Sequence, residues 1–338
     1  MNYLRTIYYL IFISLLSSCI TEDIPDNNIY GNYQALWEVL DKHYCFFEEK
    51  KADYGLDWNE VYTKYKEKLY PAMDNKQFFE VCANMLAELK DGHVNMYAAH
   101  NTARYWKWFE DYPANFSDSL QRIYLGTNYQ MASGLKYKIL NDNIGYIYCG
   151  SFENAFGSGN LNEILKELAA CNGLIIDIRN NGGGQLTSAE KLAGCFTNET
   201  RTGAYIAHKT GTGHNDFSTP KPINIEPAEG LRWQKKTVVI TNRKSYSAAN
   251  SFVMFMKSFP NVIQLGDRTG GGAGMPFSSE MPNGWGIRFS ACPMYDIHMN
   301  CTEMGIDPDI KVNQSREDLL NNQDTLIEAA RKWLKENQ

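Results

Sequence analysis

The spacing of apolar residues predicts three helices in the first third of the chain. Between residues 30 and 48, apolar side chains recur at the three- and four-residue intervals of an amphipathic helix. Residues 58–70 are typical of a second helix. A third begins at Asp74, with a capping-box glutamine three residues later, and should end at Gly92. We therefore expect a small N-terminal helical domain over residues 30–98.

The pattern changes twice after this domain. Residues 99–135 are polar and rich in aromatic side chains, and we expect an irregular segment that lines a cleft. Beyond it, apolar runs typical of buried strands alternate with amphipathic helices, which predicts an α/β core with a largely parallel sheet over residues 136–338. The expected strands are 144–148, 173–178, 205–208, 237–241 and 262–265, and the expected helices are 161–170, 189–196, 248–259 and 324–336. A Pro-Asn-Gly sequence at 282–284 predicts a hairpin turn.

The N-terminus carries the features of an export signal. Arg5 precedes an apolar run that is too short to cross a bilayer, which takes about 20 residues. The run ends in Leu-Ser-Ser-Cys at Cys19, which resembles the lipobox of bacterial lipoproteins. This resemblance implies a lipoprotein signal peptide over 1–19, lipidation of Cys19, a tether over 20–29 and a place in the bacterial cell envelope, periplasmic or surface-facing. An ordinary secretory signal with a chance cysteine is the alternative.

Composition excludes several classes of protein. The chain has 338 residues, a formal net charge of −6, 43% hydrophobic and 21% charged residues, which is ordinary for a globular protein. Its slight acidity argues against a nucleic-acid binder. The 8 cysteines and 6 histidines show no zinc-like spacing, so no metal site is expected. Several cysteines lie in apolar runs, where a thiol packs as a small hydrophobic group.

Two segments that follow expected strands carry residues suited to catalysis. Residues 177–184 end in three consecutive glycines, whose N–H groups could hold an oxyanion or a phosphate. A sharp turn between strand and helix is the alternative. Residues 242–250 place Ser245 and Ser247 before a helix, where a hydroxyl lies near free N–H groups. That position suits a nucleophile, but local sequence alone favours an N-cap at Ser245 or Ser247.

Five segments together resemble the S41 serine peptidases, the group of C-terminal processing peptidases and tricorn core proteases. They are Leu89–Val94, Leu174–Gly184, Asn242–Asn250, Gly266–Gly272 and Glu303–Asp309, in the order of the family. They look like its motifs L-x-D-x-H-[TV], D-L-R-x-N-x-G-G, N-x-x-S-x-S-A-x-E, G-x-x-T-x-G-G and E-x-x-G-[IV]-x-P-D. The resemblance implies the ClpP/crotonase-like α/β core of this family. It also implies a serine endopeptidase that hydrolyses peptide bonds through an acyl-enzyme.

Within this family, the sequence favours the tricorn-like branch. Processing peptidases use a Ser–Lys dyad, but the place of that lysine is taken here by Gly272. Lys257 lies ten residues along a helix from Ser247, which is about 15 Å by helical rise. The resemblance to the tricorn branch instead implies Ser247 as nucleophile and His93 as general base. Glu303 would then hold the imidazole in the required tautomer.

The same resemblance implies an oxyanion hole, and the sequence also departs from the family motifs at two positions. The oxyanion hole would consist of the Ala248 N–H and one N–H from Gly182 or Gly183. Gly92 stands where the tricorn branch has a serine, and Asn250 where the family has a glutamate. About 45 residues separate the expected base from the next strand of the core, which is too few for the PDZ domain of processing peptidases.

The expected partners follow from this interpretation. They are a peptide or unfolded protein substrate and a membrane, held through Cys19. No cofactor, metal, nucleotide or nucleic acid is implied. Two other functions stay open. One is a catalytically silent peptide- or ligand-binding lipoprotein of the same fold. The other is an esterase, since the same catalytic groups can cleave an ester bond as well as a peptide bond.

Overall fold

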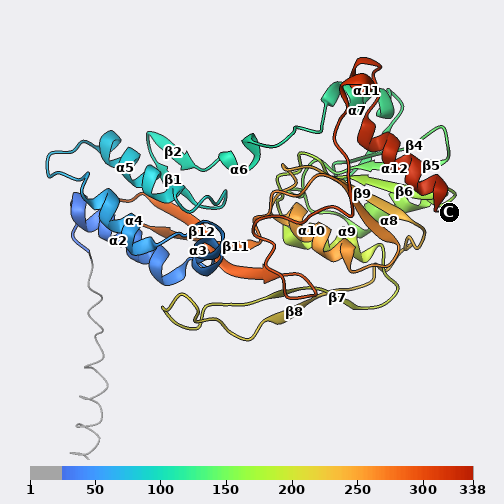
Figure 1. The fold of residues 1–338 in the computed structure, drawn as a ribbon. Coiled ribbons are helices and arrows are strands. Elements are labelled where there is room, and N and C mark those ends of the chain that lie inside the picture. The colour runs from blue at the N-terminus through green and yellow to red at the C-terminus, as the bar shows by residue number, and fades with distance from the viewer. Residues whose placement is uncertain (1–24, 338) are drawn as a thin grey trace, which may run out of the picture.

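The computed structural model describes residues 25–337, so the expected lipidation site at Cys19 lies outside the described residues. The chain forms two parts that lie side by side in Figure 1. One part contains the N-terminal helices and an antiparallel sheet, and the other contains a larger mixed sheet covered by helices. No helix within 25–337 has both the length and the apolar character needed to span a bilayer.

Four helices form the N-terminal part. They are α2 (Ile29–His43), α3 (Phe47–Tyr54), α4 (Trp58–Lys66) and α5 (Asn75–Ala87). The expected helix over 30–48 is interrupted because the Cys45 N–H leaves the helix and donates to the Ser290 carbonyl. The predicted capping box at Asp74 is present. Helix α5 ends before Gly92, because Lys90 adopts a positive φ of 47° that a helix does not permit.

A six-stranded antiparallel sheet joins these helices to the larger part (Figure 1), because some of its strands contact α2 and α5 and others contact helices of the core. Its order is β2-β1-β12-β7-β8, with β11 also paired to β12. The strands are β1 (Asn95–Ala98), β2 (Asn101–Arg104), β7 (Arg201–Ile206), β8 (Lys221–Ile225), β11 (Gly274–Glu280) and β12 (Gly286–Tyr295). The hairpin predicted at 282–284 joins β11 to β12. Strand β7 was expected in the parallel core, but it pairs with the end of β12 instead, a contact no local pattern could reveal.

The second part contains the predicted parallel-rich α/β core. Its seven-stranded sheet has the order β13-β10-β9-β6-β5-β4-β3, and only β4 and β3 run antiparallel to their neighbours. The strands are β3 (Gln130–Ala132), β4 (Leu135–Ile139), β5 (Ile144–Tyr148), β6 (Gly173–Asp177), β9 (Thr237–Thr241), β10 (Val262–Gly266) and β13 (Ile310–Lys311). The helices are α8 (Ser158–Leu168), α9 (Leu186–Gly194), α10 (Ala248–Lys257), α11 (Arg316–Leu320) and α12 (Thr325–Glu336).

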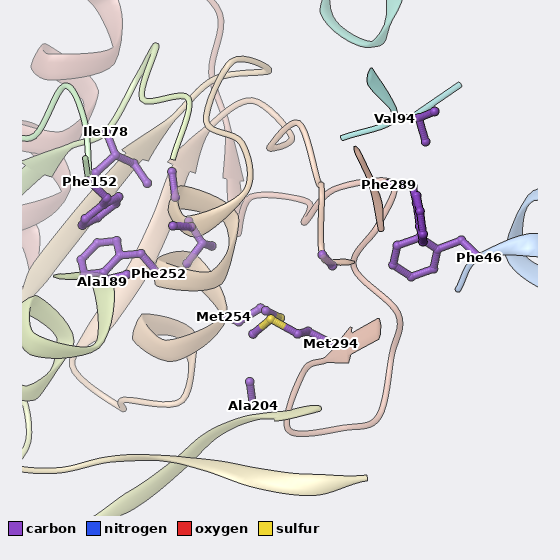
Figure 2. Packing of buried hydrophobic residues seen from close by; sticks show 14 of the residues in the cluster. Phe46, Val94, Phe152, Ile178, Ala189, Ala204, Phe252, Met254, Phe289 and Met294 are labelled. Carbon is purple, nitrogen blue, oxygen red and sulfur yellow. The ribbon is translucent and has the colours of Figure 1, made fainter. Parts of the chain in front are cut away.

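Apolar packing covers both faces of the large sheet and continues into the N-terminal part. Helices α8, α9 and α10 contribute to one buried cluster, and α12 contributes to a second on the opposite face. Figure 2 shows Phe152 beside Phe252 in the first cluster, and Phe46 against Phe289 where α3 meets β12. Because the first cluster includes residues of both parts, the two parts are held together by a shared core.

The segment 99–135 is more regular than its sequence predicts. It contains β2, two short helices, α6 (Lys107–Glu110) and α7 (Asp118–Leu125), and β3. Helix α7 is capped by the Ser117 side chain and is too short for its period to stand out. The seven described cysteines are all free thiols, and five of them are buried (Cys45, Cys82, Cys149, Cys171 and Cys195).

Candidate active site

Ser247 occupies a strained position at the start of α10. The chain leaves β9, turns, and reaches Ser247 with a φ of 58° and a ψ of −123°, which is unfavourable for a residue with a side chain. Its N–H donates to the Gly271 carbonyl at 2.8 Å, which fixes this turn. Ser245 has a different role, because its buried hydroxyl donates to the Ile178 carbonyl at 2.8 Å. The geometry therefore leaves Ser247 as the half-buried, accessible serine of the segment 242–250, whereas Ser245 is fully buried.

His93 comes from the other part of the molecule and reaches Ser247. It lies between α5 and β1, and its Nε2 is 2.9 Å from the Ser247 Oγ. Burial lowers the pKa of His93 to about 4, with the Asp91 carboxylate raising it and the Arg288 cation lowering it further. A neutral imidazole at pH 7 can accept the serine proton. The structure thus brings together two of the three expected triad residues.

Glu303 does not make a hydrogen bond with His93. Its carboxylate accepts from the Lys50 ammonium at 3.2 Å and from the Ala273 N–H at 3.0 Å. The His93 Nδ1 is buried and has no hydrogen-bond partner among the described residues. Burial, with the nearby Asp91 charge, raises the pKa of Glu303 to about 8 despite the opposing effect of Lys50.

Asp91 supports His93 more directly than Glu303 does. Its Oδ1 accepts the His93 backbone N–H at 2.7 Å, and its Oδ2 accepts hydrogen bonds from the Tyr44 hydroxyl at 3.1 Å and the Ser290 hydroxyl at 2.8 Å. The Tyr246 ring packs against the imidazole, with a centroid distance of 4.9 Å. Asp91 is 1% exposed, so its charge acts in a poorly screened environment.

The roles of two of these residues, Asp91 and Lys50, were not predicted from the sequence. Asp91 lies inside a segment that was recognised for its histidine alone. Lys50 gave no signal, because a lysine in a charged helix normally faces water. In the structure it is 1% exposed and contacts Glu303 from α3.

The expected oxyanion donors differ in availability. The Ala248 N–H, at the N-terminus of α10, has no hydrogen-bond acceptor among the described residues, and neither has the Gly182 N–H. The Gly183 N–H donates to the Asn181 Oδ1 at 2.9 Å and is therefore occupied. Gly183 nevertheless packs on Ser247, since a Cβ there would lie 2.8 Å from the Ser247 Cβ. Of the three expected donors, the Ala248 and Gly182 N–H groups therefore remain unpaired among the described residues.

The departures from the family pattern have structural counterparts. A Cβ on Gly92 would lie 2.7 Å from the Trp108 Nε1, so a tryptophan of the segment 99–135 fills the place of the tricorn serine. Trp108 stacks on Tyr246 with a centroid distance of 4.2 Å. A side chain on Gly272 would collide with the same tyrosine ring. Lys257 pairs with the exposed Asp309 at 2.5 Å, so neither position offers a lysine to the nucleophile.

A cavity of about 400 Å³ opens beside Ser247. It is bounded by the start of α9, the start of α10 and the strands β11 and β12, so both parts of the molecule contribute to it. Within residues 25–337, no three His, Cys, Asp or Glu side chains are close enough together to hold a metal ion. The cavity is therefore lined by the Ser247 hydroxyl, which His93 contacts, and by Ala248, whose N–H is unpaired among the described residues.

Comparisons with known proteins relate this chain to proteases. The chain is 30% identical over 175 residues to a tricorn-like protease C-terminal subunit of Sulfurisphaera tokodaii, covering 48% of this chain and 18% of that protein. It is 26% identical over 180 residues to the carboxy-terminal processing protease CtpB of Bacillus subtilis, covering 52% and 35%. The chain thus spans about a third or less of these curated relatives.

A solved structure and two family models extend further along the chain. The crystal structure of a protein described as a peptidase from Parabacteroides merdae has 45% sequence identity and a TM-score of 0.87, covering 91% of this chain and 97% of that one. The tricorn protease C1 domain matches residues 25–87, and peptidase family S41 matches residues 143–312, half of the sequence. The chain belongs to peptidase family S41.

Proposed function

We propose that this protein is a serine endopeptidase in which Ser247 is the nucleophile and His93 is the general base. The observation that carries the proposal is the 2.9 Å separation of the Ser247 Oγ and the His93 Nε2 at the mouth of a cavity. The Ser247 Oγ attacks the carbonyl carbon of a peptide bond, and its proton passes to the His93 Nε2. The negative charge that develops on the carbonyl oxygen is stabilised by the Ala248 N–H.

The reaction is completed in two further steps. The C–N bond breaks, the leaving amine takes the proton from His93, and the acyl group stays on Ser247. A water molecule then attacks the ester while its proton passes to His93. Return of that proton to the serine releases the acid and restores the free hydroxyl. The substrate class we propose is a peptide or an unfolded protein.

Two carboxylates are candidates for the third catalytic role. The family resemblance assigns this role to Glu303, in a Ser–His–Glu triad. The contacts favour Asp91, because its carboxylate holds the His93 backbone and its charge raises the imidazole pKa. We propose Asp91 as the positioning residue that stabilises the imidazolium, and we treat the Glu303 assignment as its rival.

Substitutions separate these two assignments. Asp91→Asn should lower kcat by about 100-fold or more and move the acid limb of kcat/KM to lower pH, because the charge that raises the His93 pKa is lost. Glu303→Gln should leave the position of that limb unchanged. A larger loss of kcat in Glu303→Gln, with an unchanged profile in Asp91→Asn, would support the Ser–His–Glu triad instead.

Covalent labelling tests the proposed function itself. A fluorophosphonate should label the wild type but neither Ser247→Ala nor His93→Ala. Ser247→Ala should lower kcat on peptides by roughly 10⁴ or more. Lys257→Ala serves as the matched control, because its ammonium contacts Asp309, and it should be labelled like the wild type. An unlabelled wild type that cleaves no peptide of a random library would instead favour a silent binding protein.

We also propose that the protein is anchored in the bacterial cell envelope through a lipid on Cys19. The support is the lipobox-like sequence that ends the apolar N-terminal run. Feeding cells an alkyne-labelled fatty acid should label the full chain and should not label Cys19→Ala. Labelling of both forms would contradict the proposal.

A further inference from the structure

The cavity beside Ser247 is mostly uncharged. Its apolar lining consists of Leu186, Met275, Pro276 and Met294, and its polar lining lies near the start of α9 and α10. Only one of the lining side chains carries a charge, namely Arg288 of β12. A single cation in an otherwise uncharged cavity selects strongly by charge, because no other ion in the cavity competes for the substrate.

Arg288 faces the catalytic group. It stands opposite Asn95 in the pairing of β12 with β1, two residues after His93. Side chains two apart on a strand share a face, and Ser290, two residues along β12, donates its hydroxyl to Asp91. The face of β12 that carries Arg288 is therefore the face turned toward the Asp91 carboxylate and the His93 imidazole.

The guanidinium of Arg288 has no partner of its own. Within residues 25–337 it makes no salt bridge and no hydrogen bond, although the side chain is half-buried. Arg179, in contrast, is paired with Asp177 at 2.6 Å and Asp324 at 2.9 Å. Arg331 likewise contacts two carboxylates. A guanidinium offers a planar set of donors that matches a carboxylate, and that set is unused in Arg288.

The location of this cation also affects the chemistry. Burial and the Arg288 charge both lower the pKa of His93, which opposes the imidazolium that must form during attack. A carboxylate bound to Arg288 would neutralise that charge at the moment of reaction. The site is therefore more favourable for catalysis when the substrate itself supplies an anion.

We propose that Arg288 binds a carboxylate of the substrate, so that the protein prefers to cleave beside an acidic side chain or beside the C-terminal carboxylate of a peptide. This inference rests on the proposed peptidase function and adds the substrate class. Both sources offer the same chemistry to the guanidinium. They differ in whether the anion lies inside the chain or at its end.

Peptide cleavage tests the proposal. A random-sequence peptide library, with cut sites identified by mass spectrometry, should show Asp or Glu enriched beside the cut, or cuts concentrated near free C-termini. Peptides that differ only in Glu against Gln, or in a free acid against an amide, distinguish the two sources. The carboxylate form should have a kcat/KM about 10- to 100-fold higher, the range of a charge-assisted hydrogen bond.

Substitutions test whether the preference for a carboxylate depends on Arg288. Arg288→Gln should abolish the discrimination, and Arg288→Glu should reverse it toward a lysine in the same peptide position. Arg268→Gln is the matched control, because Arg268 lies outside the cavity near the exposed Asp307, and it should discriminate like the wild type. Equal turnover of the carboxylate and neutral peptides by the wild type, or discrimination that survives in Arg288→Gln, would overturn the proposal.

A binding measurement separates this inference from the proposed function. Calorimetry on Ser247→Ala, which lacks the nucleophile, should show tighter binding of the Glu or free-acid peptide than of its neutral counterpart. Equal affinities overturn the Arg288 proposal even when the wild type cleaves peptides. Failure of fluorophosphonate labelling, together with a clear affinity difference, overturns the peptidase and leaves the carboxylate site in place.

Discussion

The buried pair of Lys50 and Glu303 predicts how stability depends on pH. The Lys50 side chain is 1% exposed and the Glu303 side chain 3%, and burial with the Asp91 charge raises the pKa of Glu303 from 4.5 to about 8. The folded state therefore keeps a proton that the unfolded state releases. The stabilisation that this bound proton gives the folded state is fully present below about pH 4.5 and is lost as the pH rises to about 8. At about 1.4 kcal/mol per pH unit, the loss amounts to about 5 kcal/mol.

Lys50→Met removes the cation from this group. At about pH 6 Glu303 is protonated and neutral, so the variant loses the Lys50 hydrogen bond rather than an ion pair, and the free energy of unfolding should fall by about 1–3 kcal/mol. Lys50 holds the pKa of Glu303 down, so that pKa rises further in the variant. In the variant the free energy of unfolding should therefore keep falling above pH 8. Its difference from the wild type should grow by about 1.4 kcal/mol by pH 9.

Urea denaturation at about pH 6 and about pH 9 measures both effects. Lys42→Met, which makes the same chemical change in the exposed pair with Glu38, should cost less than about 0.5 kcal/mol at either pH. Combining Lys50→Met with Glu303→Gln should remove the extra loss above pH 8, since no carboxyl is left to titrate there. A loss in Lys50→Met that is equal at both pH values would refute the reasoning.

Three further predictions concern single sites. Gly92→Ser should cost about 1–3 kcal/mol in urea denaturation, because its Cβ meets the Trp108 and Tyr246 side chains, whereas Gly159→Ser faces open space and should cost nothing measurable. His93 has a folded pKa of about 4 against 6.5 unfolded, so stability should fall as the pH drops from about 6.5 to 4, and His93→Gln should flatten that slope. Arg179→Met should lower the free energy of unfolding by about 3–5 kcal/mol, because it breaks a buried ion pair. Arg201→Met, in a more exposed pair, should lower it by less than about 0.5 kcal/mol, and chemical denaturation measures both values.

Local patterns predicted the parts of the fold that depend on local interactions. The bounds of β5 and β9 match the expected strands 144–148 and 237–241, because continuous apolar runs are buried on both faces of a parallel sheet. The capping box at Asp74 was equally readable, since both of its members lie within one turn. The motif that singled out Ser247, the proposed nucleophile, lies at the tight turn between β9 and α10.

Long-range pairings could not be predicted in the same way. The pairing of β7 with β12 joins residues about 90 positions apart, and nothing in either strand specifies its partner. The contact of Lys50 with Glu303 joins residues 253 positions apart. The same limit applies to the support of His93, because whether Asp91 or Glu303 lies nearer depends on how two parts of the fold dock.

The sharing of the site between two parts of the chain has a consequence for biosynthesis. His93 and Ser247 are 154 residues apart in the sequence, and β1, next to His93, is held by β12, which is made after both. An emerging or partly folded chain therefore carries each group without the other. The proposed nucleophile therefore meets its proposed base only when nearly the whole chain has been completed and docked, so under the proposed mechanism a newly made, partly folded chain cannot cleave its neighbours.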